Sequence, residues 1–159
     1  MKATLLVVGR VKGVMADPIR EYEQRIRHYF SFEVVEVKEE SASRGRSPQQ
    51  VMEGEGERLL DRVPAAAEVM ALHRTGDAWS SEKLARHLER LAVGSHPGIA
   101  LIIGGAFGLA PAVLARADRL LSLSALTLPH ELARLVITEQ LYRAGTILRG
   151  EPYHKTTTS

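Results

Sequence analysis

The chain has 159 residues, with 21 Lys and Arg against 19 Asp and Glu, 45% apolar residues and no cysteine. This length predicts one compact domain over residues 1–159, because a chain of this size can bury a single core. Without cysteine there is no disulfide scaffold, no thiolate nucleophile and no cysteine-ligated metal site. The net charge of +2 permits nucleic acid as a partner without requiring it.

Short apolar runs rich in β-branched residues alternate with helical patterns along the chain. This alternation is typical of an α/β fold in which helices cover a mostly parallel sheet. The expected strands are 4–8, 32–37, 68–72, 99–103 and 119–123.

Helix start signals stand between these expected strands. Asp17 can cap a first helix with Pro18 in its first turn. The run from Ser47 to Gln50 has the sequence of a capping box, which predicts a second helix to about residue 61. The remaining helices are expected after Ser80 or Ser81 with Leu84, Leu88 and Leu91 buried, from near Pro111 to before Arg119, and from near Pro129.

The sequence shows no targeting or membrane-spanning pattern. The apolar run at residues 4–8 is too short for the core of a signal peptide. The longest uncharged stretch, 97–115, is interrupted by glycine and proline, which argues against a membrane span. We therefore expect a cytoplasmic protein with no membrane partner.

The last expected helix is apolar around most of its circumference rather than along one stripe. A helix with this pattern is buried on more than one side. Because a small sheet covers only one side, we predict that a second copy of the chain covers the other and that the protein is a homodimer. The apolar positions are Leu132, Ala133, Leu135, Val136, Ile137, Leu141, Ala144, Ile147 and Leu148.

Two uncharged segments each begin with a buried strand and continue into a loop of small residues. In the first, 99–109, Gly104, Gly105 and Gly108 let the backbone bend sharply and approach a ligand. The second, 120–130, offers hydroxyls, backbone groups and apolar walls without charge, which suits a neutral ring such as adenine. For both segments the alternative is a purely structural turn, with hydroxyls that satisfy turn and cap hydrogen bonds.

Other chemistry has less support in the sequence. Ser124 and His130 are a possible nucleophile pair, but no Gly-x-Ser-x-Gly motif and no acidic partner accompany them. The six histidines show no metal-ligand spacing, so no metal site is expected. The segment 149–155 combines a tyrosine, a histidine and cations, which suits RNA contacts as well as a solvated tail.

Four motifs together resemble one known family. They are Ile102-Ile103-Gly104-Gly105 with Gly108-Leu109, the run from Ser122 to His130, the pattern Glu139-x-Leu141-Tyr142-Arg143-Ala144, and Pro152-Tyr153-His154. In this order, and over essentially the whole chain, they are similar to the RlmH family of ribosomal large-subunit RNA methyltransferases. The resemblance implies a SPOUT α/β fold with a deep C-terminal trefoil knot. It also implies a homodimer that transfers a methyl group from S-adenosylmethionine (SAM) to N3 of a pseudouridine in helix 69 of 23S ribosomal RNA.

The resemblance further implies roles for single residues. It places Arg143, Tyr153 and His154 on the substrate side. Our own hypothesis is that His154 accepts or relays the N3 proton, that Tyr153 stacks on or orients the base, and that Arg143 stabilises developing charge or holds phosphate. Lys155 would also contact substrate, although the family usually has arginine there, whose planar fork lysine lacks. The residues expected to hold SAM are Leu72, Gly105, Ser124, Ala125, Leu126, Thr127, Leu128 and Pro129.

A dimer could also place Arg10, Lys12, Arg44, Arg46 and the C-terminal tail of one subunit beside the active site of the other. Such a patch would attract ribosomal RNA in the assembled particle, and no DNA partner is expected. Two alternatives stay open from the sequence. One is a ribosome-binding module that performs no chemistry, and the other is a SPOUT methyltransferase with a different RNA target.

Overall fold

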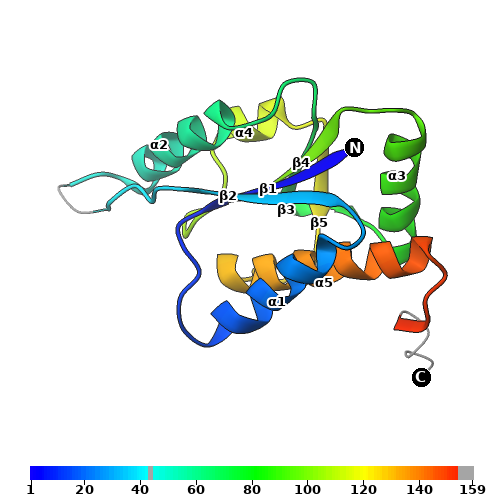
Figure 1. Cartoon of the computed structure of the whole chain (residues 1–159). Helices are drawn as coiled ribbons and strands as arrows, with labels where there is room; N and C mark the ends of the chain where they lie inside the picture. The colour runs from blue at the N-terminus through cyan, green and yellow to red at the C-terminus, as the bar shows by residue number, and fades with distance from the viewer. Residues whose placement is uncertain (43–44, 154–159) are drawn as a thin grey trace.

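The computed structural model describes residues 1–42 and 45–153. Five parallel strands form one sheet in the order β2-β1-β4-β3-β5 (Figure 1). The prediction of an α/β fold with a parallel sheet is confirmed. The strands are Lys2–Val8 (β1), Ser31–Val37 (β2), Glu68–Ala78 (β3), Gly98–Ile103 (β4) and Arg119–Ser122 (β5). The helices are Ala16–Ile26 (α1), Pro48–Asp61 (α2), Ser81–Val93 (α3), Pro111–Arg116 (α4) and His130–Leu148 (α5), with a 3-10 turn at Gly13–Met15.

Helices cover both faces of the sheet, and β4 in its centre is buried throughout. Ile99, Leu101 and Ile103 pack with the core on the side of α1, α3 and α5. Ala100 and Ile102 pack with the core on the side of α2 and α4. Because side chains alternate along a strand, a strand covered on both faces must be apolar at every position.

Helix α2 begins with the predicted capping box. The Ser47 side chain accepts a hydrogen bond from the Gln50 backbone, and the Gln50 side chain accepts one from the Ser47 backbone. The helix also contains Gly56, where an added Cβ atom would lie 2.9 Å from the Ala110 Cβ at the start of α4. A glycine in this helix interior therefore allows α2 and α4 to approach closely.

Strand β3 is longer than predicted. It continues from Leu72 to Ala78, with a register shift against β5 between Leu72 and Asp77. The extra residues, 73–78, are polar or small, so they lack the apolar run of a buried strand. Gly76 permits this irregular pairing, because a Cβ atom there would lie 2.5 Å from the backbone carbon of Leu120.

The start of α1 differs from the prediction. The helix begins at Ala16, and its cap residue Met15 makes no side-chain capping bond. Asp17 is not the cap but lies in the first turn, where its negative charge favours the helix dipole. The helix follows directly on the 3-10 turn and so begins two residues earlier than predicted.

Helix α5 lies between α1 and α3 beneath the sheet (Figure 1). Ile137, Leu141 and Ala144 are fully buried, whereas Leu135 and Val136 are half-buried. Neighbouring helices of the same chain therefore account for part of the apolar circumference that led us to expect a dimer. The homodimer and the trefoil knot both stay predictions at this point.

Buried charges hold α5 in place. Arg134 is 6% exposed and donates to Glu23 of α1 at 2.8 Å and to Glu36 of β2 at 3.0 Å. Buried ions need such partners, because an unpaired charge in a protein interior is costly. Among the described residues, no helix combines the length and apolar character needed to cross a membrane.

Candidate functional site

A cavity of about 350 Å³ opens at the carboxyl ends of β3, β4 and β5. This is the edge at which parallel α/β sheets bind ligands. Three chain segments line it, and the start of α5 closes one side. The lining residues are Leu72, His73 and Arg74 of β3, at the start of its irregular part, Ile103 at the end of β4 with Gly104 to Leu109 after it, Leu123, Ser124, Leu126, Thr127 and Leu128 after β5, and His130 and Ala133 on α5.

Most residues expected to hold SAM lie in this cavity wall. Leu72, Gly105, Ser124, Leu126, Thr127 and Leu128 all line it, although they come from three separate segments. Ala125 and Pro129 are exposed neighbours outside the lining, and Pro129 is the cap residue of α5. The fold thus brings together six of the eight positions named from the sequence.

The glycine loop after β4 depends on close backbone packing. A Cβ atom on Gly104 would lie 2.6 Å from the backbone carbon of Gly108. Gly108 has a φ of +88°, which side chains disfavour, and its N–H donates to the Gly105 carbonyl at 3.1 Å. Small residues therefore allow a tight turn whose backbone itself forms the cavity wall.

Serine hydroxyls shape the loop after β5. The Ser122 hydroxyl lies 3.1 Å from the Arg74 carbonyl and 3.0 Å from the Ser124 carbonyl, and the Leu126 N–H donates to the Ser124 hydroxyl at 3.0 Å. These bonds stabilise the turn, as expected from the alternative in which the serine hydroxyls have a purely structural role. They are compatible with a binding role, because the same turn presents its backbone to the cavity.

Sequence reasoning missed His73 and Arg74 in this wall, and it placed Phe107 in the candidate loop 99–109 without naming it as a contact residue. The first two follow Leu72, where the predicted strand stops, and belong to the irregular part of β3. Phe107 is 44% exposed, and Leu126 in the facing loop is 74% exposed. Large apolar side chains exposed beside a cavity are a signal of a contact surface.

A buried acid behind the glycine loop was also missed. Glu55 of α2 is 4% exposed, and a Cβ atom on Gly105 would lie 2.7 Å from its Oε1. Burial raises the pKa of Glu55, and the nearby Glu39 raises it further. The available signal was its spacing from Val51 and Leu59, which places Glu55 on the apolar face of α2.

The expected substrate-side residues Arg143 and Tyr153 meet at the other end of α5. Both contact Glu139, whose Oε1 accepts from Arg143 Nη2 at 2.6 Å and from the Tyr153 hydroxyl at 3.0 Å. The Arg143 guanidinium also lies 4.9 Å from the Tyr153 ring centre. Tyr22 and Tyr142 pack against this group, with the Tyr142 and Tyr153 ring centres 4.8 Å apart.

These contacts set the protonation of both residues. Burial, together with hydrogen bonds to Tyr22 and Glu139, raises the pKa of the Tyr153 hydroxyl above its usual value. The hydrogen bond to Glu139 raises the pKa of Arg143. At neutral pH, Tyr153 is therefore a neutral donor and Arg143 a cation.

A single chain does not bring this group to the cavity. His130 and Arg143 are 13 residues apart on α5, which at 1.5 Å per residue is about 20 Å. In Figure 1 the helix runs from the carboxyl edge of the sheet back to the opposite side, where it ends at Leu148. His154 and Lys155, the other two expected substrate-side residues, and Arg44 lie outside the described residues.

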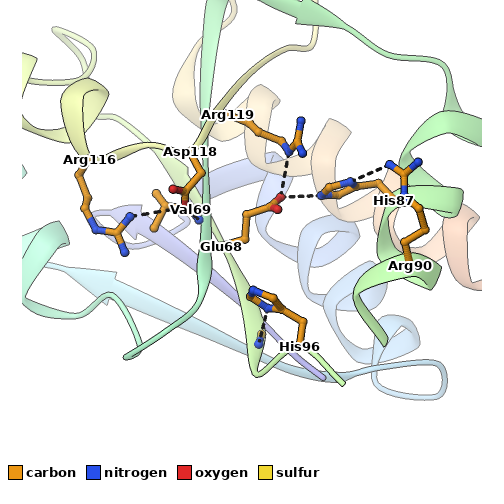
Figure 2. Close-up of polar contacts among 9 residues, drawn as sticks. Glu68, Val69, His87, Arg90, His96, Arg116, Asp118 and Arg119 are labelled. Carbon is orange, nitrogen blue, oxygen red and sulfur yellow. Dashed lines mark hydrogen bonds and ion pairs between the residues drawn. The ribbon is translucent and has the colours of Figure 1, made fainter. Parts of the chain in front are cut away.

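Charged side chains gather at the amino ends of β3 and β5, away from the cavity. Glu68 Oε1 lies 2.5 Å from His87 Nε2 and 3.3 Å from Arg119 Nε (Figure 2). Arg90 contacts the second ring nitrogen of His87 at 3.2 Å, and His87 is only 3% exposed. Within the described part of the chain, no three histidine or acidic residues lie together in an arrangement that could hold a metal ion.

Two curated relatives are similar to this chain over nearly its whole length. One, from Gemmatimonas aurantiaca, is 51% identical over 156 residues, covering 98% of this chain and 100% of the relative. The other, from Rubrobacter xylanophilus, is 51% identical and covers 96% of this chain and 98% of the relative. Both carry the name ribosomal RNA large subunit methyltransferase H.

Solved structures show the same fold at low sequence identity. A protein from Bordetella pertussis Tohama I described as a methyltransferase matches with a TM-score of 0.54 and 16% identity, covering 90% of this chain and 95% of that one. A protein from Legionella pneumophila, described as a methyltransferase and solved with its bound cofactor SAM, matches with a TM-score of 0.51 and 14% identity, over 91% of this chain and 66% of that one. The family model of SPOUT methyltransferases matches residues 1–154. The chain therefore belongs to the SPOUT methyltransferase family.

Proposed function

We propose that the protein transfers a methyl group from SAM to N3 of a pseudouridine in helix 69 of 23S ribosomal RNA. The observation that carries this proposal is the 51% identity, over the full length, to relatives named as large-subunit rRNA methyltransferases. The cavity adds independent support, because its volume and uncharged loops suit a ligand with a neutral aromatic ring. We expect the reaction in the cytoplasm, on the assembled ribosome.

The residues in the cavity fit SAM. The close approach of Gly104 to the Gly108 backbone leaves main-chain groups, rather than side chains, facing the cavity. Leu72 and Leu128 would supply apolar walls for the adenine ring, and the backbone of the loop around Ser124 would recognise its edge. When bound, SAM supplies an electrophilic methyl group on a positively charged sulfur.

The protein's task in such a displacement is to align the attacking nitrogen with the methyl group and to manage one proton. Pseudouridine N3 carries a hydrogen that must leave. Tyr153 does not take it, because its raised pKa keeps the hydroxyl protonated at neutral pH. Tyr153 would instead orient the base, and the Arg143 cation would stabilise the negative charge that develops on the ring. His154 remains our predicted proton acceptor.

The active unit we propose is a homodimer in which the site is shared between subunits. Arg143 and Tyr153 lie about 20 Å along α5 from the cavity of their own chain. If two copies pack with their α5 helices antiparallel, the C-terminal end of one helix lies near the cavity of the other. The half-buried apolar residues of α5, among them Leu135 and Val136, would supply part of the interface.

A labelling experiment tests the reaction. Ribosomes lacking the helix 69 methylation, with and without prior pseudouridylation, are incubated with the protein and SAM labelled in its methyl group. We expect label in 23S RNA only when pseudouridine is present. Label in both samples would indicate another RNA target, and SAM binding without label would favour a ribosome-binding module that performs no chemistry.

Mixed dimers test the shared site. A Gly104→Ala subunit has a disrupted cavity, and a Tyr153→Ala subunit has a defective substrate side, so either homodimer should be inactive. Co-expression of the two with different tags gives heterodimers in which one of the two sites is intact. We expect such heterodimers to recover up to half of the wild-type activity. An inactive heterodimer would show that both residues must belong to the same chain.

A further inference from the structure

One carboxylate oxygen next to the cavity is left without a partner. Glu55 Oε2 accepts a hydrogen bond from the Glu40 backbone N–H at 3.2 Å, but Oε1 is buried and has no hydrogen-bond partner among the described residues. This oxygen faces Gly105, where a Cβ atom would lie 2.7 Å away. Because Gly105 lines the cavity, only one backbone segment separates the oxygen from a bound ligand.

The charges around Glu55 do not neutralise it. Glu39, in the segment after β2, is negative and raises the pKa of Glu55, whereas Arg58 on α2 and His130 at the start of α5 lower it. Arg58 is committed elsewhere, since it donates to the Lys38 carbonyl at 2.9 Å and pairs with Glu40 at 2.7 Å. The largest influence is burial, which opposes ionisation. Arg58 and His130 therefore compensate an ionised Glu55 only in part.

A positive charge in the cavity would add to that compensation. Buried charges cost free energy unless a counter-charge lies nearby, and the attraction between charges weakens slowly with distance in a partly desolvated site. SAM carries a positively charged sulfur, but its product S-adenosylhomocysteine carries a neutral thioether. The two ligands otherwise differ only by the transferred methyl group, so a buried acid behind the cavity wall, which does not contact that group, distinguishes them by charge.

We propose that Glu55 is the positioning residue by which the cavity prefers the cationic SAM over its neutral product S-adenosylhomocysteine. This inference rests on the proposed function, because it assumes that the cavity holds SAM. Glu55 acts through the Gly105 segment rather than by contact with the reacting atoms. Its role is to favour binding of the reactant and release of the product, since the positive charge disappears when the methyl group leaves.

Isothermal titration calorimetry tests this role with three ligands: SAM, S-adenosylhomocysteine and sinefungin. Sinefungin is an analogue in which a carbon that bears an amine replaces the methylated sulfur. We compare the wild type with Glu55→Gln, and use Glu57→Gln as a matched control because Glu57 is exposed on the same helix. We expect Glu55→Gln to weaken SAM and sinefungin binding about tenfold, as for one partly screened charge pair, and to leave S-adenosylhomocysteine unchanged. Glu57→Gln should leave all three affinities unchanged.

Equal weakening of all three ligands would overturn the proposal, because a merely structural Glu55 would act on every ligand alike. If Glu55→Gln does not fold, the pH dependence of binding replaces it, measured in a variant that carries both His73→Gln and His130→Gln, the two histidines in the cavity wall. We expect the ratio of SAM to S-adenosylhomocysteine affinity to rise with pH as Glu55 ionises. Because both ligands have the same amino acid end, its titration affects both affinities alike and cancels from the ratio. A constant ratio would overturn the proposal. Failure of the wild type to bind either ligand would overturn the proposed function and this inference together.

Discussion

The two ends of the sheet differ in how far their buried polar groups have partners. At the amino end, Glu68 is surrounded by His87 and Arg119, and Arg90 supports the second nitrogen of the imidazole (Figure 2). At the carboxyl end, uncharged loops surround a cavity, and one oxygen of Glu55 has no partner among the described residues. Functional sites often retain such incomplete interactions, which a ligand can complete. The comparison indicates that the amino end stabilises the fold, and it supports our proposal that the carboxyl end binds SAM.

The largest effect expected from this comparison is that of Glu68→Ala. Removing this carboxylate leaves a buried histidine and an arginine without their shared partner. We expect the free energy of unfolding to fall by about 3 kcal/mol, as when one member of a buried pair is removed. Urea denaturation measures this change, and SAM affinity at the carboxyl end should stay within twofold of the wild type. A large loss of SAM affinity in a folded variant would contradict the division between the two ends.

Two glycines allow the same kind of substitution at opposite ends. In Gly104→Ala the new Cβ would lie 2.6 Å from the Gly108 backbone, and in Gly98→Ala it would lie 2.5 Å from the Lys2 carbonyl oxygen. We expect Gly104→Ala to weaken SAM binding about 100-fold, since a shift of about 1 Å in a binding loop has effects of that size. Gly98→Ala should lower the melting temperature but retain the affinity of the protein that remains folded. Calorimetry and thermal unfolding of both variants would show whether the two effects separate.

Stability should also depend on pH through Glu55. In the folded protein the pKa of Glu55 is raised above the ordinary 4.5. Its contribution to the free energy of unfolding is therefore complete below pH 4.5 and is lost as the pH rises through the folded pKa. We therefore expect the unfolding free energy of the wild type to fall relative to Glu55→Gln as the pH rises above 4.5 and through the raised pKa of Glu55 in the folded protein. Urea denaturation of the ligand-free proteins at several pH values measures this difference. A difference that does not change with pH would show that Glu55 ionises equally in both states.

The smallest expected effect comes from an exposed pair at the amino end. Arg116 and Asp118 are 3.5 Å apart, and both side chains are more than 40% exposed (Figure 2). Exposed ion pairs contribute little, so Arg116→Ala should change the unfolding free energy by less than about 0.5 kcal/mol. The same urea experiment measures it and also serves as the control for Glu68→Ala. A loss as large as that of Glu68→Ala would show that charge at this end matters regardless of burial.

The sequence predicted most elements because their signals are local. The capping box at Ser47, the cap at Ser80 and the proline at the start of α4 each depend on neighbouring residues, and each is found where it was predicted. The strand order β2-β1-β4-β3-β5 depends on contacts between distant segments, which no local pattern encodes. The extension of β3 past Leu72 was missed for the same reason, because its polar residues pair with β5 through the backbone.

The candidate site was predictable to the extent that backbone geometry defines it. Runs of small uncharged residues after two strands indicated the cavity, and the resemblance to a family selected positions such as Leu72 and Gly105 within it. Glu55 was missed because an acidic residue in a helix normally faces solvent, although its spacing from Val51 and Leu59 places it on the apolar face of α2. The separation of Arg143 from the cavity was also hidden, since sequence order does not give the direction in which α5 runs.

The aromatic residues give two regions of the molecule separate spectroscopic signals. The only tryptophan, Trp79, lies against the His87 ring with the two ring centres 5.0 Å apart, beside the Glu68 network. Tyr22 lies on α1, Tyr29 just after that helix ends, Tyr142 on α5 and Tyr153 beyond α5, and the Tyr142 ring contacts the other three. Tryptophan fluorescence therefore reports the state of the amino-end network. Tyrosine absorbance reports the docking of residue 153 on α5. The two regions of one unlabelled chain can thus be followed independently in the same sample.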